Sequence, residues 1–241
     1  MNYSECAFMK TALISGSSSG IGKATSEHFL KKGFRVVGLA RDHHKFDCKL
    51  RNFIPVEVDL SNVEKLSISV KNIVKSHDKI STFVSNAGFG DFRALENFSD
   101  VQIYEFLKVN LISHIVLCKI LVSHMKKHKE GNIFLMGSEA ALTGKKYSTL
   151  YSAAKFGLRG FAQSLREEAA GSGIKICVIN PGTVRTPFFD KLTFEPSASP
   201  CNAIEPHDIA KVIFELQNIR TGTIVDEINL SPAVKSINFK K

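Results

Sequence analysis

The sequence of 241 residues lacks the long apolar run that a membrane-spanning helix requires. Such a helix needs about 18 consecutive apolar residues. The best candidate, residues 111–122, is interrupted by Ser113, His114 and Lys119. The first residues contain Glu5 and no apolar segment, which argues against a secretory signal. We therefore expect a cytoplasmic protein with no membrane partner.

The patterns typical of disulfide frameworks and metal sites are also missing. The five cysteines are scattered along the chain, with no C-x-x-C motif and no histidine at ligand spacing. We expect reduced thiols and no metal site. The pair His43-His44 lies in a polar stretch and is interpreted as part of a solvated loop.

Positive charge is in excess, but it is not concentrated in one segment. The formal net charge is +9, and the densest basic run, residues 126–129, is typical of a helix end, where cations complement the helix dipole. No aromatic residues interleave with it, as a base-stacking surface would need. We expect no nucleic-acid partner, whereas the overall charge suits phosphorylated cofactors or acidic substrates.

Short strand-like apolar runs alternate with helical patterns along the chain. The strand-like runs are residues 10–15, 35–39, 53–58, 79–85, 132–136, 174–179 and 223–230, and the helical patterns are residues 20–32, 62–76, 101–127, 150–170 and 206–219. This alternation predicts an α/β doubly wound, Rossmann-type fold, with a parallel sheet of about seven strands and helices on both faces. Ser61 and Asp100 are the expected N-caps of two helices.

No repeat, linker or low-complexity segment divides the sequence. Residues 9–241 are therefore expected to form a single domain after a short N-terminal tail, residues 1–8. The least regular segment is residues 187–205, which contains three prolines. A long stretch without a clear pattern in an α/β chain is often a mobile lid or a substrate-binding loop. A disordered surface loop is the alternative.

A glycine-rich turn joins the first predicted strand to the first predicted helix. Residues 15–22 read Ser-Gly-Ser-Ser-Ser-Gly-Ile-Gly. Glycines let the backbone turn sharply and approach a pyrophosphate, whose charge is met by N–H groups at the helix N-terminus. The pattern predicts a dinucleotide site made by Gly16, Ser18, Ser19, Gly20, Ile21 and Gly22.

The end of the second predicted strand indicates which dinucleotide is bound. In such folds a carboxylate at this point binds the ribose 2′-hydroxyl of NAD, whereas an arginine accepts the 2′-phosphate of NADP. Here Ala40 leaves room, and Arg41 supplies a fork that matches a phosphate. The sequence favours NADP(H), while Asp42, which follows, keeps NAD(H) open.

Ser138, Tyr151 and Lys155 form the chemically most informative pattern. Tyr151 and Lys155 are one helical turn apart, and Ser138 ends a strand-like run upstream. A phenol has an ordinary pKa of about 10, and a neighbouring ammonium favours its ionised form, so we expect Lys155 to lower the pKa of Tyr151. Ser138 would then hold a carbonyl oxygen while Tyr151 exchanges a proton. Alone, this spacing also occurs on ordinary amphipathic helices.

Taken in order, the motifs resemble those of the short-chain dehydrogenase/reductase family, single-domain Y-x-x-x-K type, over residues 9 to 232. Residues 15–22 resemble its T-G-x-x-x-G-I-G loop, and residues 85–88 resemble its N-N-A-G motif with Ser85 for the first Asn. Ser138, Tyr151 and Lys155 match its catalytic residues. The resemblance implies Asn110 as a fourth active-site residue. It also implies cofactor contacts from Tyr151, Lys155, Asp59, Leu60, Asn86, Ala87, Gly88, Pro181, Gly182, Val184 and Thr186.

This resemblance implies an enzyme that moves a hydride between the nicotinamide of NADP(H) and a carbonyl or secondary alcohol. Ser138 would bind the carbonyl oxygen, Tyr151 would transfer the proton and Lys155 would hold the nicotinamide ribose. Asn110 would position a water. A non-catalytic NADP(H)-sensing or interaction protein on the same fold is the alternative.

The resemblance is less specific about the substrate and about the oligomeric state. The substrate is expected to be a small to medium, partly apolar carbonyl or alcohol compound that touches Ser138, Glu139, Tyr147, Tyr151 and Phe188. Relatives are commonly homodimers or homotetramers through two long helices, here residues 101–127 and 150–170. The resemblance therefore implies a homo-oligomer.

Overall fold

The computed structural model describes residues 9–44, 46 and 51–240. The predicted tail, residues 1–8, lies outside the described residues, as do Cys6 and Cys48.

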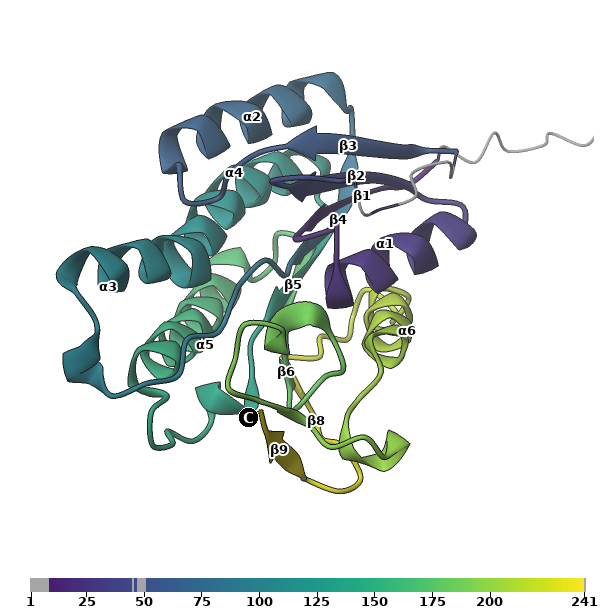
Figure 1. Ribbon diagram of the computed structural model, residues 1–241. Coiled ribbons are helices and arrows are strands. Elements are labelled where there is room, and N and C mark those ends of the chain that lie inside the picture. The colour runs from purple at the N-terminus through teal and green to yellow at the C-terminus, as the bar shows by residue number, and fades with distance from the viewer. Residues whose placement is uncertain (1–8, 45, 47–50, 241) are drawn as a thin grey trace, which may run out of the picture.

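Seven strands form one parallel sheet in the order β3-β2-β1-β4-β5-β6-β8 (Figure 1). Their bounds are β1 (Thr11–Ser15), β2 (Arg35–Ala40), β3 (Phe53–Glu57), β4 (Ile80–Ser85), β5 (Gly131–Met136), β6 (Ile174–Pro181) and β8 (Glu227–Leu230). The strand order reverses between β1 and β4, and in such sheets ligands bind outside the carboxyl ends of the strands at this point. The predicted fold class is confirmed.

The last strand of the sheet is shorter than the predicted residues 223–230. Thr223 donates its backbone N–H to the carbonyl of Arg220 in a turn, and pairing with β6 begins only at Glu227. The apolar run there therefore covers a turn and a connection as well as a strand.

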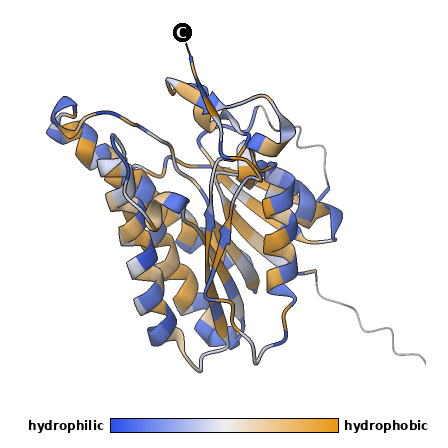
Figure 2. Ribbon diagram, turned by 90° about the horizontal axis from the view of Figure 1, so that it is seen from below, coloured by the Kyte–Doolittle hydropathy of each residue, from blue (hydrophilic) through white to orange (hydrophobic). Residues whose placement is uncertain are grey.

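Helices cover both faces of the sheet (Figure 2). On one face lie α2 (Val63–Ser76), α4 (Ser113–His128) and α5 (Thr149–Ala169), and on the other lie α1 (Gly20–Lys31) and α6 (Pro206–Gln217). Strand alternation produces the two cores, because Leu13 of β1 points into the first and its neighbours Ala12 and Ile14 point into the second.

The predicted helix 101–127 consists of three consecutive elements. These are α3 (Asp100–Leu107), a π-helical turn (Lys108–Ile112) and α4. By length and composition, Asp100–His128 is apolar enough to cross a membrane. In this fold, however, its residues Leu117, Leu121 and Met125 are completely buried in the core against the sheet.

Both predicted N-caps are displaced by one residue. The carboxylate of Asp59 accepts the backbone N–H and the hydroxyl of Ser61, so that Asn62 caps α2 instead. At α3 the cap is Ser99, which forms a reciprocal capping box with Gln102.

The segment 187–205, called the substrate loop below, is more ordered than predicted. It contains two 3-10 turns (Pro187–Phe189 and Pro200–Asn202) and β7 (Phe194–Pro196). Strand β7 pairs antiparallel with β9 (Ile237–Phe239). Residues 232–240, called the C-terminal strap, therefore lie along the loop (Figure 1).

Candidate active site

The glycine-rich turn is closely packed against the loop that follows β4. Gly16 (φ 69°) and Gly20 (φ 53°) adopt left-handed conformations that favour glycine. A Cβ at Gly22 would collide with the Gly16 carbonyl and lie 2.6 Å from Nδ2 of Asn86. Ser15 Oγ accepts hydrogen bonds from the backbone N–H groups of Asn86 (2.9 Å) and Ala87 (3.1 Å). The predicted dinucleotide residues therefore meet at one place, at the N-terminus of α1.

Arg41 and Asp59 lie together at the adjacent edge of the sheet. Arg41 is exposed directly after β2, and its charge helps to lower the pKa of Asp59. The main cause of that lowering is the hydrogen bond that Asp59 accepts from the Ser61 backbone. A cavity of about 440 Å³ opens beside Asp59. Leu60, by contrast, has its side chain in the hydrophobic core, so it stabilises this edge of the sheet by packing.

His43 corrects the prediction of a solvated histidine pair. His44 is exposed, but His43 is buried, and its Nε2 lies 3.0 Å from Oγ of Ser17 in the glycine-rich turn. Burial lowers the pKa of His43. The polar residues around His43 in the sequence do not indicate this burial. It depends on contacts with Ser17 and Phe53, which lie on other segments of the chain.

Asn110 is fully buried within the π-helical turn. Its Oδ1 accepts the backbone N–H of Phe89 (3.1 Å), and its Nδ2 donates to the carbonyl of Phe106 (3.1 Å). A single π turn within an α-helix is frequent at functional sites. The widened turn thus directs Asn110 at the loop that carries Gly88.

Ser138 and Tyr151 come together from the end of β5 and the start of α5. Oγ of Ser138 accepts the backbone N–H of Ala140 (3.1 Å), and the backbone N–H of Ser138 donates to Oδ1 of Asn180 (3.2 Å). Burial raises the pKa of Tyr151 to about 12, while the hydrogen-bonding side chain of Ser138 acts in the opposite direction. The phenol is therefore held in its protonated form at neutral pH.

Lys155 lies one turn after Tyr151 and is only 3% exposed. Its Nζ donates to the carbonyl of Met136 (2.8 Å), and burial lowers its pKa to about 8. The predicted lowering of the Tyr151 pKa by Lys155 is wrong for this structure: burial raises that pKa, and the groups that shift it further are Ser138 and Glu139.

Residues 181–186, which begin at the end of β6, lie next to the glycine-rich turn. Gly182 donates its N–H to the Leu230 carbonyl (2.7 Å), and Val184 is buried against Ile204. A Cβ at Gly20 would lie 3.2 Å from the side chain of Thr186. Pro181, which ends β6, thus leads into a segment that touches the glycine-rich turn.

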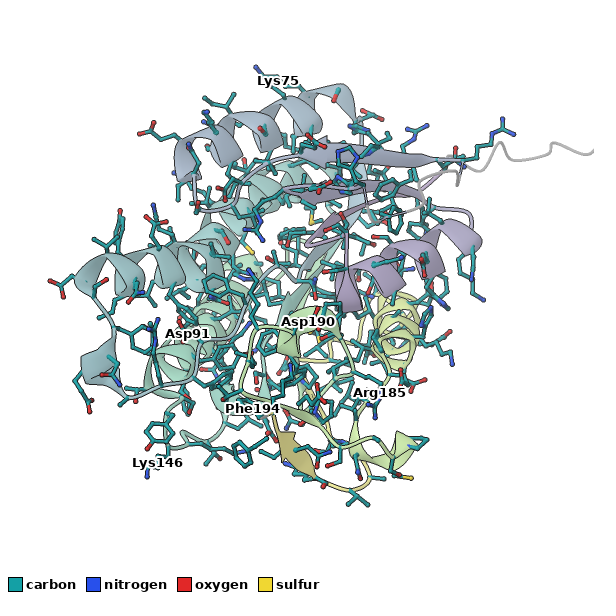
Figure 3. All side chains as sticks on the ribbon, in the orientation of Figure 1. Lys75, Asp91, Lys146, Arg185, Asp190 and Phe194 are labelled. Atoms are coloured by element: carbon teal, nitrogen blue, oxygen red, sulfur yellow. The ribbon has the colours of Figure 1, made fainter. Side chains whose placement is uncertain are left out.

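Aromatic side chains surround Tyr151 on the substrate side. The rings of Phe92 and Phe188 lie 5.1 Å and 6.1 Å from that of Tyr151. Phe194 of β7 packs on Phe92 at 5.3 Å. A cavity of about 380 Å³ lies beside these rings; it is lined by Asp91, Phe92, Arg93, Lys191, Leu192, Thr193 and Phe194. Two of these residues, Asp91 and Phe194, are labelled in Figure 3. The sequence did not single out Phe194, because only the pairing of β7 with β9 brings it here.

Two predicted substrate residues have different environments. Glu139 is held between Lys145 (2.9 Å) and Lys235 of the C-terminal strap (2.6 Å), and it helps to raise the pKa of Tyr151. Tyr147 is half exposed, and among the described residues no hydrogen bond or ring contact joins it to Tyr151; Lys146 covers its ring instead. Among the described residues, no group of three His, Cys, Asp or Glu side chains could hold a metal ion.

The fold and the site define a dinucleotide-binding protein of the Rossmann type. A family model described as short chain dehydrogenase matches residues 10–196. The chain belongs to this family, and it is an oxidoreductase that acts on CH–OH and C=O groups.

Its relatives and structural neighbours agree with this assignment. The chain is 33% identical over 187 residues to the 3-oxoacyl-acyl-carrier-protein reductase FabG of Buchnera aphidicola subsp. Acyrthosiphon pisum, covering 76% of this chain and 77% of the relative. It is 31% identical over 228 residues to FabG of Haemophilus influenzae, covering 89% and 93%. Among solved structures, ElxO with NADP bound is 26% identical, with a TM-score of 0.81 and coverage of 93% and 97%.

Proposed function

We propose that the protein transfers a hydride between NADP(H) and a carbonyl or secondary alcohol of a small to medium, partly apolar substrate. One observation carries this proposal: Ser138 adjoins the buried side chains of Tyr151 and Lys155, with the buried Asn110 nearby. A protein that only senses the dinucleotide would need no protonated phenol in contact with a hydroxyl group.

The residues around the glycine-rich turn fit a dinucleotide. Gly16, Gly20 and Gly22 let the turn pack tightly against the loops that carry Asn86 and Thr186, so its backbone N–H groups lie at the N-terminus of α1, where a pyrophosphate would bind. Arg41 is exposed at the end of β2 and is free to meet a 2′-phosphate. A solved neighbour, ElxO, carries NADP. These points support NADP(H), and NAD(H) is the second candidate because Asp42 is adjacent to Arg41.

When bound, the nicotinamide supplies or accepts the hydride. The side chains of the protein supply or accept the proton. In the reductive direction, Ser138 donates a hydrogen bond to the carbonyl oxygen, and Tyr151 transfers its proton to that oxygen as the C–O double bond is lost. Lys155, cationic below a pKa of about 8, offers donors for a ribose hydroxyl and for the Tyr151 oxygen after proton transfer. Asn110 holds the loop that carries Gly88 in place by accepting the backbone N–H of Phe89.

The substrate side supports a partly apolar molecule. Phe92, Phe188 and Phe194 provide the apolar walls, and the adjoining cavity carries Arg93 and Lys191 at its polar side. Two relatives are reductases of 3-oxoacyl groups, which combine a carbonyl with an apolar chain. A homo-oligomer and a cytoplasmic location stay predictions.

The test is turnover of NADPH and NADH with a panel of aldehydes, ketones and 3-hydroxy acids. We expect substrate-dependent oxidation of NADPH, or reduction of NADP⁺ by the alcohols, with NADPH preferred. Tight NADP(H) binding without turnover of any compound would contradict the proposal and favour a sensor. Preferential use of NADH would correct only the cofactor assignment.

A further inference from the structure

Helix α4 carries a buried histidine, His114, directly behind the proposed nicotinamide side of the site. Its Nδ1 shares a hydrogen bond of 2.7 Å with Oγ of Ser85, the last residue of β4. Both side chains are 0% exposed. Ser85 stands where the family motif has an asparagine, and it is followed by residues 86–88 of the cofactor loop. In this chain the residue at that position therefore has a partner on α4.

His114 and Asn110 fix the two ends of one short loop. They are four residues apart, so they lie on the same side of the helix. Asn110 accepts the backbone N–H of Phe89, and His114 bonds to Ser85. Between these two attachments lie residues 86–88, whose Gly88 would place a Cβ 4.0 Å from Nζ of Lys155.

We propose that His114 is a positioning residue: through Ser85 it sets the place of residues 86–88 against the nicotinamide side of the bound cofactor and against Lys155. This inference rests on the proposed function. It gives Ser85 a defined role in this chain, as one half of a pair whose other half is His114.

The surroundings of His114 agree with a positioning role and not with proton transfer. Burial, and next the charge of Lys155, lower the pKa of His114 to about 3, while the backbone of Ala87 acts in the opposite direction. The imidazole is therefore neutral in the range where dehydrogenases are assayed.

The same helix supplies a matched control. His124 is also buried, and its Nε2 accepts the backbone N–H of Ile80 (3.1 Å), the first residue of β4. His114 and His124 thus attach α4 to opposite ends of one strand. Only the His114 end adjoins the catalytic residues, so a purely structural role predicts equal effects of the two substitutions on function.

The experiment compares His114→Leu, Ser85→Ala, the double variant and His124→Leu in the full chain. Three properties are measured: amide hydrogen exchange of residues 86–89 without cofactor, affinity for NADP⁺ and for 2′,5′-ADP, and kcat with its pH profile. The fragment 2′,5′-ADP occupies only the adenosine end, so it separates nicotinamide positioning from general binding.

For His114→Leu we expect exchange at residues 86–89 to accelerate about tenfold or more. NADP⁺ affinity should fall, 2′,5′-ADP affinity should stay within about threefold, and kcat should drop about 10- to 100-fold with an unchanged shape of the pH profile. Ser85→Ala should act in the same direction, and the double variant should be no worse than His114→Leu because the pair acts as a unit. His124→Leu should leave these properties within about threefold, even where it lowers Tm.

Equal losses in His114→Leu and His124→Leu, or multiplicative losses in the double variant, would overturn the proposal. A pH profile that loses one limb in His114→Leu would instead make His114 an acid or base, and would overturn it too. If the wild-type protein turns over no substrate, the proposed function fails. Hydrogen exchange and the comparison of NADP⁺ with 2′,5′-ADP then still decide the role of His114, and Ser85→Ala decides it if His114→Leu does not fold.

Discussion

The ammonium of Lys155 lies 5.7 Å from the ring centre of Tyr151, and it donates its hydrogen bond to the carbonyl of Met136. The cation is thus positioned over the face of the phenol. Both groups are buried, which pushes the pKa of Tyr151 up to about 12 and that of Lys155 down to about 8. The lowered pKa of Lys155 reflects the free-energy cost of burying an ammonium group in the fold.

Replacement of Lys155 by Met should stabilise the fold while removing activity. The pKa of Lys155 falls from 10.5 to about 8 on folding, so we expect the free energy of unfolding at pH 7 to rise by about 1–3 kcal/mol in the variant. Between these two pKa values the unfolded chain keeps a proton that the folded protein has released. Wild-type stability therefore rises with pH from about 8.

Urea unfolding of wild type and Lys155→Met at pH 7 and pH 9.5 measures this difference. The advantage of the variant should shrink at the higher pH. A variant that is less stable than the wild type at pH 7 would show that the hydrogen bond to Met136 outweighs the burial of the charge.

Replacement of Arg41 by Ala should weaken NADPH binding specifically. A bidentate, charge-assisted contact to the 2′-phosphate would be lost, and we expect affinity for NADPH to fall about 10- to 100-fold while that for NADH changes less than about threefold. Arg35→Ala, at the opposite end of β2, is the control and should change neither. Equal losses for both cofactors would exclude a contact to the 2′-phosphate. Isothermal titration of each variant provides the affinities.

The C-terminal strap should influence substrate binding more than stability. Lys235 pairs with Glu139 next to Ser138, and Lys240 donates to the Phe189 carbonyl (2.5 Å). Exposed ion pairs contribute about 0–1 kcal/mol each, so Lys235→Ala/Lys240→Ala should barely change Tm. The substrate loop is held less firmly, and KM for the substrate should rise about 3- to 10-fold with cofactor affinity unchanged.

The control for the strap is Lys211→Ala, which removes a lysine on α6 that is as exposed as Lys235 and is also paired with a carboxylate. Steady-state kinetics of the two variants measure the effect. An unchanged KM in the strap variant would show that β7 is held by its pairing with β9 alone.

His114 should make the protein sensitive to acid. Its pKa falls from 6.5 to about 3 on folding, because burial opposes the charged form. Below pH 6.5 the unfolded chain binds a proton that the folded protein refuses, so stability falls as the pH falls towards 3. Relative to its own stability at pH 7, His114→Leu should lose about 2–3 kcal/mol less than wild type by pH 4.5. Parallel stability curves for the two proteins would contradict this.

The sheet and the order of site residues followed from local patterns. Each strand is a short apolar run, and residues such as Ser138 and Asn86 come directly after one, so the topology alone brings them to the same edge. The glycine-rich turn was equally readable, because its conformations at Gly16 and Gly20 require glycine.

What the sequence did not show depends on contacts between distant segments. The π turn at Asn110 interrupts a helical pattern that continues unchanged on both sides. The burial of His43 depends on packing, and the ordering of the substrate loop depends on β9, more than 30 residues away. The direction of the Tyr151 pKa was mispredicted for the same reason, since spacing reports a neighbouring charge but not burial.

The most direct test of the account is kcat of Tyr151→Phe, measured with NADPH and the best substrate of the panel and accompanied by the Kd for NADPH. The variant keeps the buried ring and loses only the hydroxyl group that carries the proton. We predict that kcat falls by a factor of about 10³ or more while Kd changes less than about threefold. A variant that retains a tenth or more of the wild-type kcat would contradict the assignment of Tyr151 as the proton donor.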